Sequence, residues 1–420
     1  MTIAPNRPSR ISRSAAAFLG LNRGMVGLLS MVILVGMGER MAERFLPIYL
    51  MALGGGALSI GLLNGLDNLL SALYSFPGGY LSDRLGTKRA LLVFNLLAIF
   101  GFLVVILIPA WPAVIAGSLF FLSWTAISLP TTMSLVARVL PKNKRTMGVS
   151  MHSLVRRIPM ALGPILGGLM ITTWGETRGV RLAFVGALVL AVVAMVLQQR
   201  MILDETKSAG DRRKAQINPL RLFREMPTAL RRLLVSDILV RFCEQIPYAF
   251  VVVWAMKSIA HPVSAFEFGV LTTIEMAIAV LVYVPVAWMA DRTTKKPFVA
   301  LTFVFFTLFP LALLFCQSFW TLAAAFVLRG LKEFGEPTRK ALIMDLAPSG
   351  KEAGMFGLYY LMRDVVVSVA AFGGAFLWQV SPAVNFLTAF GFGVLGTAWF
   401  IAFGKDESPM SGARTWRAMP

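Results

Sequence analysis

Gly79-Tyr80-Leu81-Ser82-Asp83-Arg84-Leu85-Gly86-Thr87-Lys88-Arg89 places one acid, three bases and two glycines between two long apolar runs. A related charged turn, Ala290-Asp291-Arg292-Thr293-Thr294-Lys295-Lys296, returns 208 positions later and again lies between apolar runs. Two copies of one hydrophilic turn, each joining hydrophobic segments, predict a duplicated membrane protein.

The composition agrees with a chain that lies in a lipid bilayer. Of the 420 residues, 57% are hydrophobic and only 15% are charged, and the mean hydropathy is +0.72. Soluble domains carry about a quarter of charged residues. Apolar runs of about 20 residues, each long enough to cross the hydrocarbon core as a helix, recur along the chain. We predict an all-α polytopic membrane protein with twelve transmembrane helices in two pseudo-symmetric six-helix bundles.

The polar and basic segments set the predicted domain bounds and orientation. Residues 25–201 hold the first six apolar runs and residues 229–404 the second six, separated by a basic linker at 202–228. This linker and the tails at 1–24 and 405–420 are rich in bases, as the positive-inside rule requires of cytoplasmic segments. Both termini are therefore predicted to be cytoplasmic, and the protein is predicted to be a multi-pass protein of the cell (inner or plasma) membrane.

Several function classes conflict with the sequence. Cytoplasmic loops account for the net charge of +19, and no basic, aromatic-interleaved soluble domain is present to bind nucleic acid. No HExxH, GxSxG, P-loop or metal-ligand spacing occurs, so we expect no enzyme, no ATP-driven export, no cofactor and no metal. Cys243 and Cys316 lie in separate apolar runs and suggest no disulfide framework. The protein is expected to be a monomer.

The internal repeat continues into the predicted spans. Asp67 is matched by Glu275 at the same offset of 208, and Arg156 is matched by Arg363 at an offset of 207. Charges at matching places in both halves indicate parallel six-helix repeats with a site at their interface. That is an architecture of secondary transporters.

With twelve spans, a basic central linker and the loop from Gly79 to Arg89, the chain resembles the major facilitator superfamily, whose signature motif lies between the second and third helices. The resemblance implies a cytoplasmic latch that holds the two halves together in the outward-facing state. The implied latch residues are Gly79, Asp83, Arg84, Gly86, Lys88 and Arg89, with Asp291 and Arg292 in the second copy.

A second motif lies in the fifth span. Gly163-Pro164-Ile165-Leu166-Gly167-Gly168 resembles the helix-packing motif of bacterial drug and metabolite antiporters, with Pro159 where that motif usually has glycine. The family often places an arginine linked to proton coupling in the fourth span. Here that span reads Phe120-Phe121-Leu122-Ser123-Trp124, and a comparable Arg329 stands in the tenth span instead.

Charges inside spans are costly, by about 2.5–3.5 kcal/mol each on insertion scales, and they usually face a cavity or each other. The proton-coupling candidates are Glu43, Asp67 and Glu275, because a low-dielectric cavity favours a neutral carboxyl group. Arg241 and Glu244 are spaced to pair within one helix. The candidates for the substrate cavity or its counter-charges are Arg40, Arg156, Arg241, Glu244, Arg329, Glu333, Glu336 and Arg363. Salt bridges or gates that never touch substrate are an equal interpretation of each of these charges.

The sequence therefore predicts a secondary active transporter that moves a small organic solute by alternating access. The motif in the fifth span favours a proton-coupled exporter of drugs or metabolites. The many buried Arg and Glu residues favour a proton- or gradient-driven importer of a small charged or zwitterionic organic solute. A non-transporting membrane receptor or scaffold is the alternative from another class. The expected partners are the lipid bilayer, the solute and protons.

Overall fold

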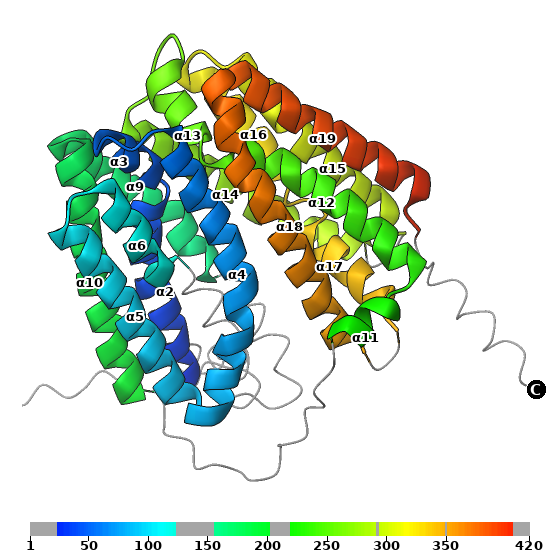
Figure 1. Cartoon of the computed structure of the whole chain (residues 1–420), viewed down its shortest axis with the longest axis horizontal. Helices are drawn as coiled ribbons and strands as arrows, with labels where there is room; N and C mark the ends of the chain where they lie inside the picture. The colour runs from blue at the N-terminus through cyan, green and yellow to red at the C-terminus, as the bar shows by residue number, and fades with distance from the viewer. Residues whose placement is uncertain (1–22, 123–154, 202–218, 291–293, 349–350, 406–420) are drawn as a thin grey trace, which may run out of the picture.

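The computed structural model describes residues 23–122, 155–201, 219–290, 294–348 and 351–405, and these residues form helices joined by short turns (Figure 1). The helices up to the central linker are α2 (Arg23–Glu43), α3 (Leu46–Ala52), α4 (Ala57–Leu85), α5 (Thr87–Leu107), α6 (Trp111–Phe121), α9 (Arg157–Trp174) and α10 (Glu176–Met201). Those that follow are α11 (Pro219–Arg224), α12 (Thr228–Tyr248), α13 (Val251–Val253), the π-helix η2 (Trp254–Ser258), α14 (Ala265–Ala290), α15 (Lys296–Leu314), α16 (Phe319–Leu331), α17 (Glu336–Asp345), α18 (Glu352–Val380) and α19 (Pro382–Phe403).

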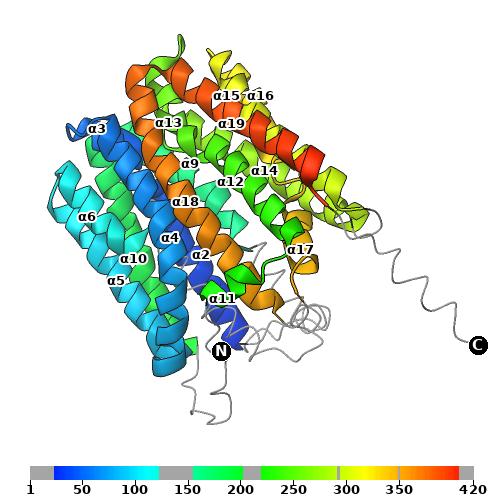
Figure 2. The same cartoon turned by 45° about the vertical axis from the view of Figure 1, so that its right-hand side comes forward.

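The helices pack in two groups (Figures 1 and 2). In the first group α9 and α10 pack on α2, and α5 packs on α6 and α10; in the second group α12 and α15 pack on α19, and α12 also packs on α18. The two groups meet along two helix pairs, α4 with α18 and α9 with α14. The predicted bundle bounds and the cytoplasmic location of the termini stay predictions, because most of each tail lies outside the described residues.

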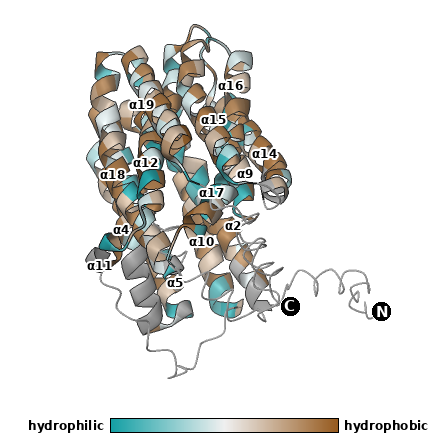
Figure 3. Ribbon diagram, turned by 90° about the vertical axis from the view of Figure 1, so that its right-hand side faces the viewer, coloured by the Kyte–Doolittle hydropathy of each residue, from teal (hydrophilic) through white to brown (hydrophobic). Residues whose placement is uncertain are grey.

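Six of the described helices are long and apolar enough to cross a membrane, namely α5, α10, α14, α15, α18 and α19. A seventh span results if α12 and Val251–Ser258, which are bent by 40° from each other, count as one. Large apolar side chains such as Phe100 and Val189 are exposed, and Figure 3 shows hydrophobic residues along α14, α15 and α19. This surface suits helices that face lipid, but twelve spans remain a prediction.

Three of the predicted continuous spans are interrupted in the structure. The first span is broken at Arg44–Phe45 between α2 and α3, the seventh after Tyr248, and the tenth at residues 332–335 between α16 and α17. A proline lies close to each break: Pro47, Pro247 and Pro337. Proline lacks the backbone donor that a continuous helix needs, so helices break there. Broken helices are tolerated at membrane depth where they line a cavity.

Glycines allow close approach where the two groups of helices meet. A Cβ atom added to Gly61 in α4 would lie 2.5 Å from the Cβ of Ala375 in α18. A Cβ added to Gly269 in α14 would lie 2.5 Å from the carbonyl oxygen of Pro164 in α9. Real side chains do not fit at such distances, so glycine is what permits these helix contacts.

The glycines of the predicted antiporter-like motif pack α9 between two neighbours. Gly163 faces α2 at Arg40, Gly167 faces the backbone of α2 at Met41, and Gly168 faces the backbone of α14 at Ala265. One helix of the first group is therefore in backbone contact both with its own group and with the other group. The part that this motif plays in antiport stays a prediction.

Replacing Gly168 by alanine should destabilise the protein, because the new Cβ would press on the backbone of Ala265. Such overpacking loses about 1–3 kcal/mol of stability. Gly391→Ala is the matched control, since a Cβ at this glycine of α19 would meet nothing within 4 Å. That change should be neutral or stabilising by up to about 1 kcal/mol. Thermal unfolding of the two purified variants in detergent tests this, and equal midpoints would contradict it.

Candidate functional site

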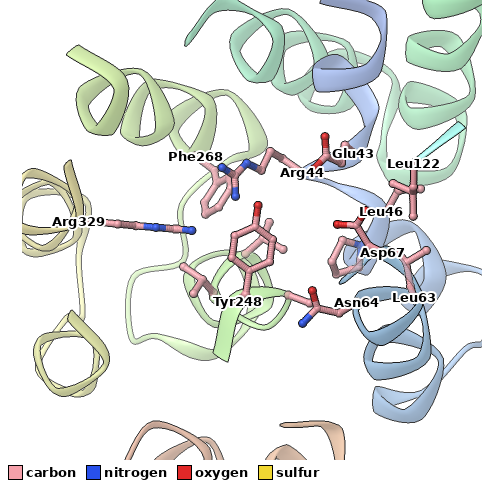
Figure 4. A pocket seen from close by; sticks show the side chains of 14 residues that line it. Glu43, Arg44, Leu46, Leu63, Asn64, Asp67, Leu122, Tyr248, Phe268 and Arg329 are labelled. Carbon is pink, nitrogen blue, oxygen red and sulfur yellow. The ribbon is translucent and has the colours of Figure 1, made fainter. Parts of the chain in front are cut away.

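A pocket lies where helices of the two groups face each other, and its empty space, counting the mouth, is about 510 Å³ (Figure 4). Its polar and aromatic lining combines Glu43, Arg44, Asn64 and Asp67 of the first group with Tyr248, Phe268 and Arg329 of the second. The breaks in the first and seventh spans lie at its wall, since Arg44 and Tyr248 both line it. The pocket is therefore built jointly by the two halves of the chain.

Among the described residues that line the pocket, Arg44 and Asp67 are the charged side chains that form no ion pair. In the part of the chain that the structure describes, neither side chain has an ion-pair or hydrogen-bond partner. The guanidinium of Arg44 lies over the ring of Tyr248, 5.1 Å from its centroid. A solute in this pocket would thus meet one cation and one carboxyl group that the protein itself leaves unneutralised.

The other charge on this side of the pocket is already paired. Nη1 of Arg40 lies 2.7 Å from Oε2 of Glu43, and it also donates a hydrogen bond to Oε1 of the same carboxylate at 2.8 Å. Next to this pair, Asn64 donates to the carbonyl oxygen of Gln245 at 3.1 Å, and Asn68 donates to its Oε1 at 3.3 Å. These two hydrogen bonds join α4 to α12 and so connect the two groups beside the pocket.

Glu275, which matches Asp67 in the sequence repeat, lies in a different environment. Its side chain is only 1% exposed, and its Oε1 lies 3.2 Å from Nε of Arg329 and 3.5 Å from Nζ of Lys332. Lys332 also donates to Oε1 of Glu244 at 2.7 Å. Two cations therefore hold Glu275, whereas Asp67 has none among the described residues.

A smaller pocket of about 270 Å³ adjoins this cluster. Phe306, Phe309 and Lys332 line it, and it shares Tyr248 and Arg329 with the larger pocket. The guanidinium of Arg329 lies 5.0 Å from the ring centroid of Phe309 and 5.5 Å from that of Tyr248. Arg329 is thus fixed by aromatic rings as well as by its carboxylate.

Further ion pairs extend away from the pockets through α12 and α17. Arg241 pairs with Glu244, as its spacing predicts, and its Nη2 lies 3.8 Å from Oε2 of Glu336. Glu336 in turn accepts from Nη2 of Arg339 at 2.6 Å, and Arg339 pairs with Asp237. Carboxylates and bases alternate along this path, and no three candidate metal ligands gather among the described residues.

Asp237 is the central residue of this network that sequence reasoning missed. Its side chain is 1% exposed, and besides Arg339 it contacts the hydroxyl of Tyr359, which donates at 3.0 Å, and Nη1 of Arg363 at 3.4 Å. Arg363 also donates to Asp364 at 2.7 Å. The signal that could have found Asp237 is a carboxylate inside an apolar span, one helical turn before a buried arginine.

The two remaining predicted cavity charges lie at the boundary between the groups. Glu333, in the break between α16 and α17, accepts from Nη2 of Arg157 at 3.2 Å, so an ion pair joins the two groups there. Arg156 precedes α9 directly and is half-buried. The sequence analysis selected Arg156 as a cavity charge, whereas in the structure the neighbouring Arg157 forms the ion pair with Glu333.

The signature loop is described only in part. Gly86 separates α4 from α5 with a φ of +82°, a left-handed conformation that favours glycine, so the tight turn is present. Lys88 and Arg89 follow in the first turn of α5. Gly79, Asp83 and Arg84 belong to the end of α4, but the side chains of Asp83 and Arg84, and the whole second copy at Asp291 and Arg292, lie outside the description. The latch stays a prediction.

Asp237→Asn should destabilise the protein strongly, because it leaves Arg339 and Arg363 buried without their shared counter-charge. Breaking a buried ion pair from one side costs about 3–5 kcal/mol. Asp345→Asn is the control, since its pair with Lys295 is partly exposed and such pairs contribute at most about 1 kcal/mol. Thermal unfolding in detergent compares the two, and similar midpoints would contradict a structural role for Asp237.

Many apolar membrane-length helices, packed in two groups around a charged pocket, define a transport protein of the secondary transporter class. The chain matches the Major Facilitator Superfamily over residues 28–258 and 233–418, and it belongs to that family. The predicted family membership is confirmed. Because this is a family of membrane transporters, the expectation that the protein is not an enzyme is confirmed as well.

The chain is similar to proteins from this family in sequence and in fold. An uncharacterised MFS-type transporter of Methanocaldococcus jannaschii is 21% identical over 372 residues, which are 84% of this chain and 87% of that protein. A POT family transporter solved in complex with 5-aminolevulinic acid has a TM-score of 0.76 at 13% identity, over 91% of this chain and 96% of the other. The nucleoside transporter NupG has a TM-score of 0.76 at 14% identity, over 91% of this chain and 100% of the other. The structural likenesses show a common fold.

Proposed function

We propose that this protein is a proton-coupled secondary transporter that carries a small charged organic solute through the interface pocket by alternating access. The observation that supports this most directly is the pair of unneutralised groups in the pocket, the guanidinium of Arg44 and the carboxyl of Asp67. Such groups are expensive inside a membrane protein and mark pathways for solutes or ions. We place the protein in the cell membrane as a monomer.

Contacts at one end of the interface support alternating access. There the backbone N–H of Phe266 in α14 donates to Oγ1 of Thr172 in α9 at 3.1 Å, and Lys257 pairs with Glu176. Toward the other end, where α4 ends and α18 begins, the ribbons of these two helices diverge (Figure 1). The basic loops mark this second end as cytoplasmic. The contacts at the first end therefore support a conformation in which the two groups are closed against each other on that side.

Of the three proton-coupling candidates, Asp67 suits the role best. Glu43 is paired with Arg40, and Glu275 is held by two cations. A carboxyl group without a counter-ion can take up and release a proton without breaking a buried ion pair, which would be costly. The proton site is therefore proposed at Asp67, in the same pocket as the solute.

Arg44 gives the pocket a second polar site. A guanidinium matches the shape of a carboxylate or phosphate and can donate two parallel hydrogen bonds to it. This chemistry suits a charged solute better than a neutral lipophilic one. The resemblance of Gly163–Gly168 to an antiporter motif supports export as the direction, and import is the alternative that the transport assay distinguishes.

Asp67→Asn should abolish coupling to protons. The assay uses proteoliposomes under a pH gradient of either sign and labelled amino acids, organic acids, amines and nucleosides. The wild type should accumulate its solute against a concentration gradient, and the variant should lose at least about tenfold of this accumulation, equivalent to about 1.4 kcal/mol of driving force. Exchange of labelled for unlabelled solute without a gradient should persist at saturating solute concentration, because the pocket keeps its shape.

The control for this test is Asp67→Glu, which keeps an ionisable carboxyl group and should retain coupling. If Asp67→Asn still accumulated solute as the wild type does under a pH gradient, Asp67 would not be the coupling residue. If the wild type moved none of these solutes with either gradient, the result would favour the hypothesis of a non-transporting receptor or scaffold. Comparison of right-side-out with inside-out vesicles gives the direction.

A further inference from the structure

The two carboxyl groups that correspond in the sequence repeat differ in their partners: Glu275 forms an ion pair with an arginine, whereas Asp67 forms none with a described residue. Glu275 matches Asp67 at an offset of 208, and in the second half Arg329 binds Glu275 with Nε 3.2 Å from Oε1. At an offset of 207, which also relates prolines of the fourth and tenth predicted spans, Arg329 is matched by Leu122. The first half therefore carries an apolar residue where the second half carries a guanidinium.

Leu122 and Arg329 occupy comparable places around the pocket. Both line it, and Figure 4 shows Leu122 on the same side as Asp67, with Arg329 projecting from the opposite side. Leu122 follows directly on α6, and Arg329 lies in α16. At the position that corresponds to Arg329, the pocket wall on the side of Asp67 thus has the apolar side chain of Leu122.

Two of the described cations near Asp67 are already paired with other carboxylates. Arg40 is paired with Glu43 at 2.7 Å. Arg329 is held by Glu275 and stacked on the rings of Phe309 and Tyr248. Arg44 remains, and its guanidinium lies over the ring of Tyr248. A carboxylate that is withdrawn from water is stabilised by a partner that compensates its desolvation. Asp67 is partly buried and forms no ion pair with a described residue, so a cation from outside the chain can fill this role when Asp67 is ionised.

We propose that the solute carries a cationic nitrogen group, an ammonium or guanidinium, that binds Asp67 in the place that the guanidinium of Arg329 takes beside Glu275. This inference rests on the proposed transport function and names the chemical class of its substrate. The nitrogen donates charge-assisted hydrogen bonds to the carboxylate, Leu122 contacts the apolar part of the solute, and an anionic group on the same solute would reach Arg44. The expected substrates are therefore small organic cations and zwitterions.

The test uses propylguanidinium, which reproduces the head and stem of an arginine side chain, and propylurea, its uncharged analogue. Isothermal titration of the purified full-length protein in detergent should show binding of propylguanidinium and no binding of propylurea. Asp67→Asn should weaken the affinity at least about tenfold. Leu122→Arg should have the same effect, because an arginine there would occupy the place of the ligand. Leu122→Met is the matched control and should bind like the wild type.

Folding controls and four binding outcomes decide whether a cation binds at Asp67. Size-exclusion elution and the unfolding midpoint without ligand report folding, and the near-isosteric Asp67→Asn keeps the test valid if Leu122→Arg does not fold. Absence of binding to the wild type, equal binding of propylurea, or undiminished binding to Asp67→Asn would overturn the proposal. Arg44→Gln should bind at least as tightly as the wild type; loss of binding there would assign the ligand to Arg44 instead.

The outcome is separable from that of the transport assay. If propylguanidinium binds through Asp67 but the wild type moves none of the labelled solutes, the cation site stands and transport is contradicted. If the wild type transports solutes that lack a cationic nitrogen, and propylguanidinium does not compete, transport stands and the cation site is overturned.

Discussion

The structure depends on one constraint, that a charge inside a membrane protein needs a partner. In the second half of the chain this constraint is met almost completely. Glu275, Glu244, Glu336 and Asp237 each contact at least one arginine or lysine, and these contacts tie α12, α14, α16, α17 and α18 together. In the part of the first half that the structure describes, Asp67 and Arg44 line the pocket and form no ion pair. The unpaired groups face the interface pocket, so the incomplete half is where a mobile ligand has something to contribute.

The fold was largely predictable because its signals are local. The charged turn, the apolar runs and the basic linker each lie within a short stretch of sequence, and the family follows from them. Prolines in these spans indicated possible kinks, but the sequence did not predict that the helices break there. A proline marks a place where a helix can break, but whether it does so depends on the packing of neighbouring helices, as at Pro47 and Pro337.

The sequence predicted many of the charged residues of the candidate site, but it did not predict which of them form ion pairs with residues of other helices. Arg241 and Glu244 pair as their spacing indicates, because both lie on one helix. Asp237 and Arg339 lie 102 residues apart, and they come together because α12 and α17 both pack on α18. The repeat suggested equal roles for Asp67 and Glu275. Their environments differ because of a third position, which no inspection of the two carboxylates alone would reveal.

The glycine-lined faces of α9 have a mechanical consequence. Helices that interlock through large side chains must lift those side chains out of their grooves before they can move past one another. Where Gly168 meets the backbone of Ala265, the glycine has no side chain that would have to leave a groove. At this point α9 and α14 touch through backbone, with polar links such as Thr273 to the carbonyl of Ala161 beside the contact, while Gly163 and Gly167 hold α9 against α2. In the proposed alternating access, a movement of α9 against α14 would therefore have to break polar contacts across this boundary, such as Arg157 with Glu333, but would not have to disengage large side chains at Gly168.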